Sequence, residues 1–195
     1  MRAFPGSTFL LCAIAAMFAV ELSKGALGND SVLLALGALP DTGQLHGEYW
    51  RLVTFGFLHA NFTHVLLNAM LLCLVAPVTE LRVGVVWLIV LFLGASIASG
   101  ACILIKHVIW PSLGTSVGAS GGLFGLLGAA VILVSRRPST TPRIRFALLG
   151  GAVLGFAYSV VPGVSMVGHI SGFVVGATAA NFIPMVARKA PQPTV

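Results

Sequence analysis

The sequence predicts an all-α membrane protein: a bundle of six transmembrane helices with a long membrane-associated loop between the first and the second. Hydrophobic residues make up 57% of the 195 positions and charged residues only 8%, whereas soluble domains carry about 25% charged residues. Apolar stretches near the length that crosses a bilayer, about 20 residues, alternate with short breaks that carry charge or turn-forming residues. At this length a single domain, residues 1–195, is expected.

Each of the six apolar stretches is expected to cross the membrane as a helix. They cover residues 8–25, 61–79, 83–105, 117–135, 145–162 and 166–187. The polar segment between the first two is long for an unstructured loop, so we expect it to fold on or into the membrane surface. The first stretch has an alternative interpretation as a cleaved signal peptide, because its apolar core is short and Ala26 and Gly28 could mark a cleavage site.

The distribution of basic residues predicts that both termini are cytoplasmic. Cytoplasmic loops of membrane proteins carry an excess of Lys and Arg, and the six spans divide the 11 basic residues into eight on the side of the termini and three on the other. The eight are Arg2, Arg82, Arg136, Arg137, Arg143, Arg145, Arg188 and Lys189, and the three are Lys24, Arg51 and Lys106. This orientation also accounts for the net charge of +6 without a nucleic-acid partner, because the basic residues form no dense patch.

The three cysteines, Cys12, Cys73 and Cys102, lie in apolar stretches and lack the spacing of metal ligands. They are expected to be small buried hydrophobic side chains. No metal ion and no other cofactor is expected.

Four polar side chains are expected at one depth of the bundle. The second, fourth and sixth spans run in the same direction, and they carry His64 and Asn68 (in HVLLN), Ser120 (in GASGG) and His169 (in GHISGFVVG). Each lies about 5–12 Å below the start of its helix at a rise of 1.5 Å per residue. One such residue alone often bonds its own helix backbone or packs between helices. Because polar residues within membrane spans are costly, four at one level indicate a functional site.

The chemistry that these residue types favour is nucleophilic. A serine hydroxyl is a weak nucleophile until a base, most often histidine, takes its proton, so Ser120 and His169 form a candidate pair. His64, Asn68 and the backbone N–H of Ser120 are candidate donors to an oxyanion. The small residues Gly168, Gly172 and Gly176 recur at every fourth position, a spacing typical of closely packed membrane helices.

A catalytic carboxylate is not expected. The five acidic residues, Glu21, Asp30, Asp41, Glu48 and Glu80, are not clearly placed near the candidate pair. The sequence therefore predicts a Ser–His dyad, whose imidazole would be oriented by packing. Phe124 lies four residues after Ser120, on the same helix face, and could supply that packing.

At these residues the chain resembles the rhomboid intramembrane serine proteases. The segment EYWRLVTFGFLHANFTHVLLNAMLL resembles the first loop and second helix of that family, VGASGGLFGLLGA contains its GxSG nucleophile motif, and GHISGFVVG resembles its sixth helix. The three motifs occur in order between about residue 45 and residue 180. One departure is Gly168, where the family more often has alanine.

The resemblance implies a single rhomboid-type membrane domain with a water-filled cavity open to the outer side. Ser120 would be the nucleophile and His169 the general base, with His64 and Asn68 in the oxyanion hole. Phe124 would stack on the base. Trp50 and Arg51 would anchor the long loop in the membrane surface, His59 would have a structural role, and the segment from Pro162 to Val167 would cover the site.

The implied activity is that of a serine endopeptidase that cleaves single-span membrane proteins within or near their transmembrane helix. Its partners would be transmembrane substrates and the lipid bilayer, its location a bacterial cell membrane, and its oligomeric state stays open. One alternative is a catalytically inactive rhomboid-like protein that binds membrane clients. A second is a transporter or channel, which the sequence disfavours because the inner halves of the second, fourth and sixth spans are almost wholly apolar.

Overall fold

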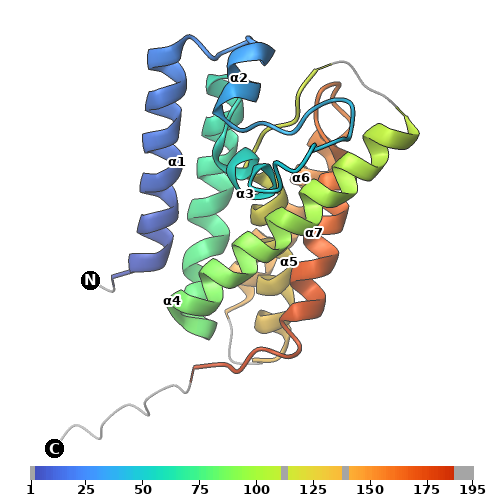
Figure 1. Cartoon of the computed structure of the whole chain (residues 1–195). Helices are drawn as coiled ribbons and strands as arrows, with labels where there is room; N and C mark the ends of the chain where they lie inside the picture. Colours follow the sequence, from blue (N-terminus) through green and yellow to red (C-terminus); the bar gives the residue numbers. More distant parts are fainter. Residues whose placement is uncertain (1–2, 111–113, 138–140, 187–195) are drawn as a thin grey trace, which may run out of the picture.

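A computed structural model describes residues 3–110, 114–137 and 141–186, and all the regular elements in these ranges are helices (Figure 1). They are α1 (Pro5–Lys24), α2 (Asp30–Leu36), α3 (Arg51–Thr54), the 3₁₀ helix η1 (Phe55–Phe57), α4 (Phe62–Ile109), α5 (Ser120–Ser135), α6 (Pro142–Tyr158) and α7 (Met166–Ala179). The predicted all-α class is confirmed. Three residues of the charge count, Arg2, Arg188 and Lys189, lie outside the described ranges.

Helix α4 consists of two limbs joined at Gly84. This glycine has φ 81° and ψ 174°, a backbone conformation that residues with a Cβ rarely adopt. In Figure 1 the first limb runs beside α1, and the second crosses in front of α5 toward α7. By length and composition, α1 and α4 could cross a membrane, whereas α5 and α7 are shorter apolar helices.

Helix α5 forms the centre of the bundle. It is apolar around its whole circumference, which is typical of a helix enclosed by others, and most of its residues are buried. Its backbone packs directly on that of α7: a Cβ at Gly172 would collide with the Gly121 carbonyl oxygen, and one at Gly176 with the Gly125 carbonyl oxygen. The glycine spacing noted in the sequence therefore brings the two helices into backbone contact.

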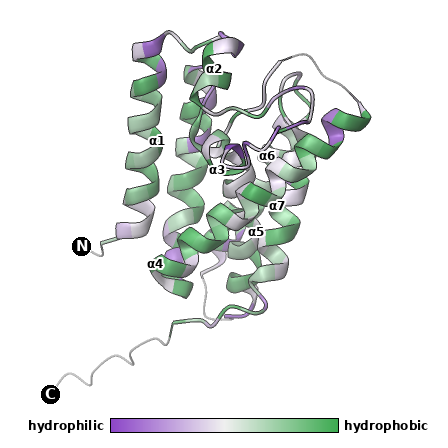
Figure 2. Ribbon diagram, viewed as in Figure 1, coloured by the Kyte–Doolittle hydropathy of each residue, from purple (hydrophilic) through white to green (hydrophobic). Residues whose placement is uncertain are grey.

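The helices consist of hydrophobic residues along most of their length, and hydrophilic residues gather at the helix ends and in the segment between α1 and α4 (Figure 2). Large hydrophobic side chains on α1, α4 and α6 are exposed, among them Phe9, Val86, Phe146, Val153 and Leu154. Such an extensive apolar surface is not typical of soluble monomers. Together with the apolar helices, it indicates an integral membrane protein.

The expectation that the cysteines are buried is wrong for two of them. Cys12 and Cys73 are exposed, and Cys102 is partly buried. Both exposed cysteines lie on apolar helices, Cys12 on α1 and Cys73 on α4. The sequence pattern could not separate these positions from the core, because in a membrane protein both are apolar.

Glu80 fixes the start of α1 against α4. Its carboxylate accepts hydrogen bonds from the backbone N–H groups of Gly6 (3.0 Å) and Ser7 (2.8 Å) and from the Ser7 hydroxyl (2.6 Å). The first N–H groups of a helix have no partner within it, and a negative charge is favourable there. Glu80 is buried, so it serves the packing of α1 on α4.

The segment of residues 25–61 folds onto one end of the bundle rather than forming an open loop, and it contains α2, α3 and η1. Arg51 holds it together. Its guanidinium donates to the carbonyl oxygens of Leu34 (2.6 Å) and Ala38 (3.0 Å), pairs with Glu48 at 2.8 Å and lies 4.6 Å from the centre of the Trp50 ring. All these contacts of Arg51 are made within residues 25–61, so they stabilise the fold of this segment.

Candidate active site

Ser120 is the first residue of α5, at the end of the bundle covered by residues 25–61. Two contacts attach the chain that leads into it. The backbone groups of Leu39 and Ser116 exchange hydrogen bonds of 3.0 Å, and Gly118 N–H donates to the Phe55 carbonyl oxygen at 2.9 Å. The folded segment between α1 and α4 therefore determines where α5 begins.

His64 lies beside this entry to α5. A Cβ at Gly118 would come within 2.8 Å of the His64 ring and 3.6 Å of the Ser120 hydroxyl, and Gly118 has a φ of 137°. Because glycine has no Cβ, Gly118 can adopt this positive φ and can also lie close to the His64 ring. The helix that carries His64 starts at a cap in which the Asn61 side chain accepts from His64 N–H at 2.9 Å.

Asn68 follows one turn after His64 and is only 4% exposed. Its side-chain nitrogen is buried and has no hydrogen-bond partner among the residues that the structure describes. A buried donor without a partner is costly in a folded protein. Such a donor is available to a ligand oxygen.

His169 lies in the first turn of α7, on the helix that packs against α5. Ser165 caps this helix, with its hydroxyl accepting from Gly168 N–H at 3.1 Å. The imidazole is 4% exposed and lies face to face with the Phe124 ring, with centroids 4.1 Å apart and planes 7° from parallel. The expectation that Phe124 packs on this ring agrees with the structure.

The backbone contact of Gly121 with Gly172 brings the first turns of α5 and α7, and hence Ser120 and His169, to one level. The Ser120 hydroxyl and the His169 imidazole are not hydrogen-bonded to each other in the part of the chain that the structure describes. In proteins without bound substrate such a contact is often long. The arrangement places a hydroxyl, an imidazole and an amide donor at one end of the bundle.

Ser159 contacts His169 and was missed by the sequence reasoning. Its hydroxyl lies 2.5 Å from His169 Nδ1 and 2.8 Å from the Gly155 carbonyl oxygen. Ser159 directly follows α6. In the sequence, a serine shortly before Pro162-Gly163 indicates only the end of a helix. The signal in the sequence is its position, since Ser159 is a hydroxyl residue in the connection that leads to the helix of His169.

Glu21 and His59 form a second buried contact behind His64. The Glu21 carboxylate accepts from His59 N–H at 2.5 Å, and the His59 ring meets the His64 ring edge to face at 5.1 Å. Both residues are fully buried. Burial lowers the pKa of His59 to about 3, with a smaller contribution from the nearby His64. The position of His59 between α1 and His64 agrees with a structural role.

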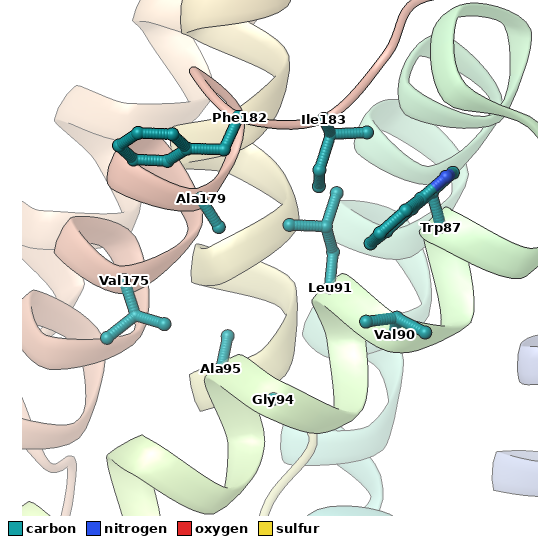
Figure 3. A pocket seen from close by; sticks show the side chains of 9 residues that line it. All are labelled: Trp87, Val90, Leu91, Gly94, Ala95, Val175, Ala179, Phe182 and Ile183. Atoms are coloured by element: carbon teal, nitrogen blue, oxygen red, sulfur yellow. The ribbon is translucent and has the colours of Figure 1, made fainter.

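A hollow of about 360 Å³ lies elsewhere, between the second limb of α4 and the end of α7 (Figure 3). Apolar side chains and one glycine line it: Trp87, Val90, Leu91, Gly94, Ala95, Val175, Ala179, Phe182 and Ile183. It is at the opposite end of α7 from His169. Without a titratable or nucleophilic side chain it supplies no chemistry, so the candidate site remains at the starts of α5 and α7.

Comparison with known proteins identifies the family. The Rhomboid domain family matches residues 46–185. The protein called "Putative rhomboid protease YdcA" of Bacillus subtilis is 33% identical over 137 residues, which cover 69% of this chain and 65% of that protein. Rhomboid protease GluP of Bacillus subtilis is 30% identical over 181 residues, covering 90% of this chain and 34% of that protein.

A plant protein, RHOMBOID-like protein 1 of Arabidopsis thaliana, is 33% identical over 161 residues, or 77% of this chain and 39% of its own length. The chain therefore spans less than two thirds of the length of each of these relatives. The matched family region, residues 46–185, includes all four candidate site residues.

Proposed function

The chain belongs to the rhomboid family, and on that premise we propose that it is an intramembrane serine endopeptidase that cleaves single-span membrane proteins within or near their transmembrane helix. One observation supports the proposal: the backbone contact of α5 with α7 brings together the two helices that begin near Ser120 and His169, and the His169 ring stacks on Phe124 of α5. A nucleophile, a base and an oxyanion donor are the groups that acyl transfer needs.

In this proposal residues 1–195 form one membrane domain with six spans: α1, the two limbs of α4, α5, α6 and α7. Both termini are cytoplasmic, and the site opens to the outer side of a cell membrane. Two hydrogen-bonded contacts support it, because Glu80 holds the start of α1 and Val186 N–H donates to the Arg82 carbonyl oxygen at 2.6 Å. The two ends of the chain that the structure describes, near Ser7 and Val186, therefore lie at the same end of the bundle as the turn at Gly84 (Figure 1).

The reaction begins when His169 Nε2 takes the Ser120 proton and Ser120 Oγ attacks the scissile carbonyl carbon. The resulting oxyanion accepts hydrogen bonds from the Asn68 amide, from His64 and from free N–H groups at the start of α5. His169 then gives its proton to the leaving amine, and a serine ester remains. Water activated by the same imidazole hydrolyses the ester and restores Ser120.

The Asn68 amide supports this assignment, since its buried donor lacks a partner in the described chain. Residues 162–167, which lead from the connection after α6 into the first two residues of α7, would cover the site and admit the substrate by moving. We propose transmembrane proteins as substrates and no cofactor.

The first test uses a fluorophosphonate probe, which reacts with activated serines and needs no known substrate. The purified protein in detergent is labelled alongside the variants Ser120→Ala and His169→Ala. We expect labelling of the wild type and none of either variant, with all three folded. Labelling that persists in Ser120→Ala would place the reactive serine elsewhere.

A folded wild type that resists the probe and also fails to cut a model single-span protein in liposomes would contradict the proposal. That outcome would favour a rhomboid-like protein that binds membrane clients without cleaving them. Cleavage of the model protein that is absent in both variants would support the assignment of Ser120 and His169.

A further inference from the structure

The Ser159 hydroxyl is the hydrogen-bond partner of the candidate base. It lies 2.5 Å from His169 Nδ1 and 2.8 Å from the Gly155 carbonyl oxygen, and both Ser159 and His169 are 4% exposed. A buried imidazole nitrogen requires a partner, and here the partner is the residue that directly follows another helix, α6.

The two contacts of the hydroxyl determine which imidazole nitrogen carries the proton. A hydroxyl has one hydrogen and two lone pairs. When it donates to the Gly155 carbonyl oxygen, which can only accept, its lone pairs face His169, so Nδ1 must carry the hydrogen and donate. A neutral imidazole has one N–H, and Nε2 is therefore left with the lone pair that a general base needs.

We propose that Ser159 is a positioning residue that holds His169 as the Nδ1–H tautomer and so completes a Ser120–His169–Ser159 arrangement. This inference rests on the proposed function. In hydrolases with a carboxylate at this position, the same hydrogen bond orients the base and stabilises the imidazolium. A hydroxyl can orient the base in the same way, but it stabilises the imidazolium less than a carboxylate would.

The arrangement makes the base depend on the position of α6. The other restraint on the imidazole, the Phe124 ring, also touches α6: its centroid is 5.0 Å from that of Phe156, and a Cβ at Gly155 would come within 2.6 Å of it. Leu148 is the one residue of α6 that is fully buried, so α6 is held by few core side chains. A shift of α6 away from the bundle would remove the hydrogen bond and one wall of the stack together.

The kinetic test compares Ser159→Ala with Ser171→Ala. Ser171 is also close to His169 in sequence, but its hydroxyl bonds only backbone oxygens, those of Val167 and Gly168. Loss of one neutral hydrogen bond is expected to lower kcat about two- to twelvefold in Ser159→Ala, with KM unchanged and with wild-type rates in Ser171→Ala. Equal rates in the two variants would overturn the proposal.

Two further variants of equal side-chain shape separate the loss of the hydrogen bond from a change in packing. Threonine and valine have the same shape, so Ser159→Thr and Ser159→Val differ in the hydroxyl alone. We expect Ser159→Thr to turn over substrate faster than Ser159→Val by the same factor of about two to twelve. This comparison remains informative if the alanine variant fails to fold, and equal rates in the pair would also overturn the proposal.

A spectroscopic test does not require that the protein is a protease. With ¹⁵N-labelled histidine, the resonances of His169 are those that disappear in His169→Gln, and their shifts identify the protonated ring nitrogen. We expect the Nδ1–H form in the wild type and in Ser159→Thr, and a loss of that preference in Ser159→Val. An Nε2–H form in the wild type would overturn the inference, whereas the expected spectra from a protein that cleaves nothing would overturn the proposed function alone.

Discussion

The His169 imidazole lies flat on the Phe124 ring, with 4.1 Å between the centroids and 7° between the planes. The stack fixes the plane of the imidazole but leaves it free to rotate within that plane. The hydrogen bond from Nδ1 to Ser159 fixes that rotation. Two weak restraints, one from α5 and one from the end of α6, thus orient this imidazole, as a carboxylate orients the histidine of a Ser–His–Asp triad.

The stack predicts the outcome of changing Phe124. In Phe124→Ala the imidazole loses its packing partner, and we expect kcat for cleavage of a model single-span protein to fall about tenfold, equivalent to about 1.4 kcal/mol of transition-state stabilisation. Phe124→Tyr keeps an aromatic face against the imidazole and is expected to stay within about threefold of the wild type. Alanine and tyrosine variants with equal kcat would show that the stack has no part in turnover.

Asn68 is expected to act in the transition state and not in substrate binding. Its buried side-chain nitrogen has no partner in the described chain, so Asn68→Ala should leave KM unchanged and lower kcat about 10²- to 10³-fold, as removal of an oxyanion donor does. The measurement is steady-state cleavage in liposomes. Thr79→Ala is a control on the same helix, since the Thr79 hydroxyl bonds backbone carbonyl oxygens of Val75 and Leu126. A rise in KM at constant kcat in Asn68→Ala would exclude the oxyanion role.

The sequence was sufficient to predict the helical class and the close packing of α5 on α7. In apolar helices, a small residue at every fourth position indicates that two helix backbones come into contact. It also predicted the Phe124 stack, since a separation of four residues places two side chains on one helix face. It could not predict Ser159 or Glu21. Ser159 contacts the Nδ1 atom of His169 across a connection without regular structure, and Glu21 contacts the backbone of His59 from a different helix. No periodicity in the sequence predicts either contact.

The contact of α5 with α7 predicts opposite effects for two helix glycines. A Cβ at Gly172 would collide with the Gly121 carbonyl oxygen, whereas one at Gly94, on α4, would meet nothing within 4 Å. Forcing apart a packed core costs about 1–3 kcal/mol, so Gly172→Ala should lower the midpoint temperature of unfolding in detergent. Gly94→Ala should match or exceed the wild type, because alanine favours helix over glycine by about 1 kcal/mol. Similar midpoints for both variants would contradict the close helix contact.

The buried imidazole of His59 predicts how stability changes with pH. Burial lowers its pKa from 6.5 to about 3, and the titratable groups near it are the Glu21 carboxylate, which contacts the His59 backbone N–H, and the His64 ring. Between pH 6.5 and pH 3 the unfolded chain binds a proton at His59 that the folded chain does not. The contribution of His59 to stability is therefore complete above pH 6.5 and falls as the pH is lowered, by up to about 1.4 kcal/mol per pH unit.

The measurement is the midpoint temperature of unfolding at pH 7.5, 6.0 and 5.0, for the wild type and for His59→Gln, which keeps a polar side chain but does not titrate. Other groups titrate in the same range, so the quantity that tests the prediction is the difference between the two slopes. We expect the wild type to lose stability more steeply on acidification than His59→Gln. Parallel slopes would mean that the His59 imidazole reaches solvent or accepts a proton without unfolding, and its role in holding α1 against His64 would then be wrong.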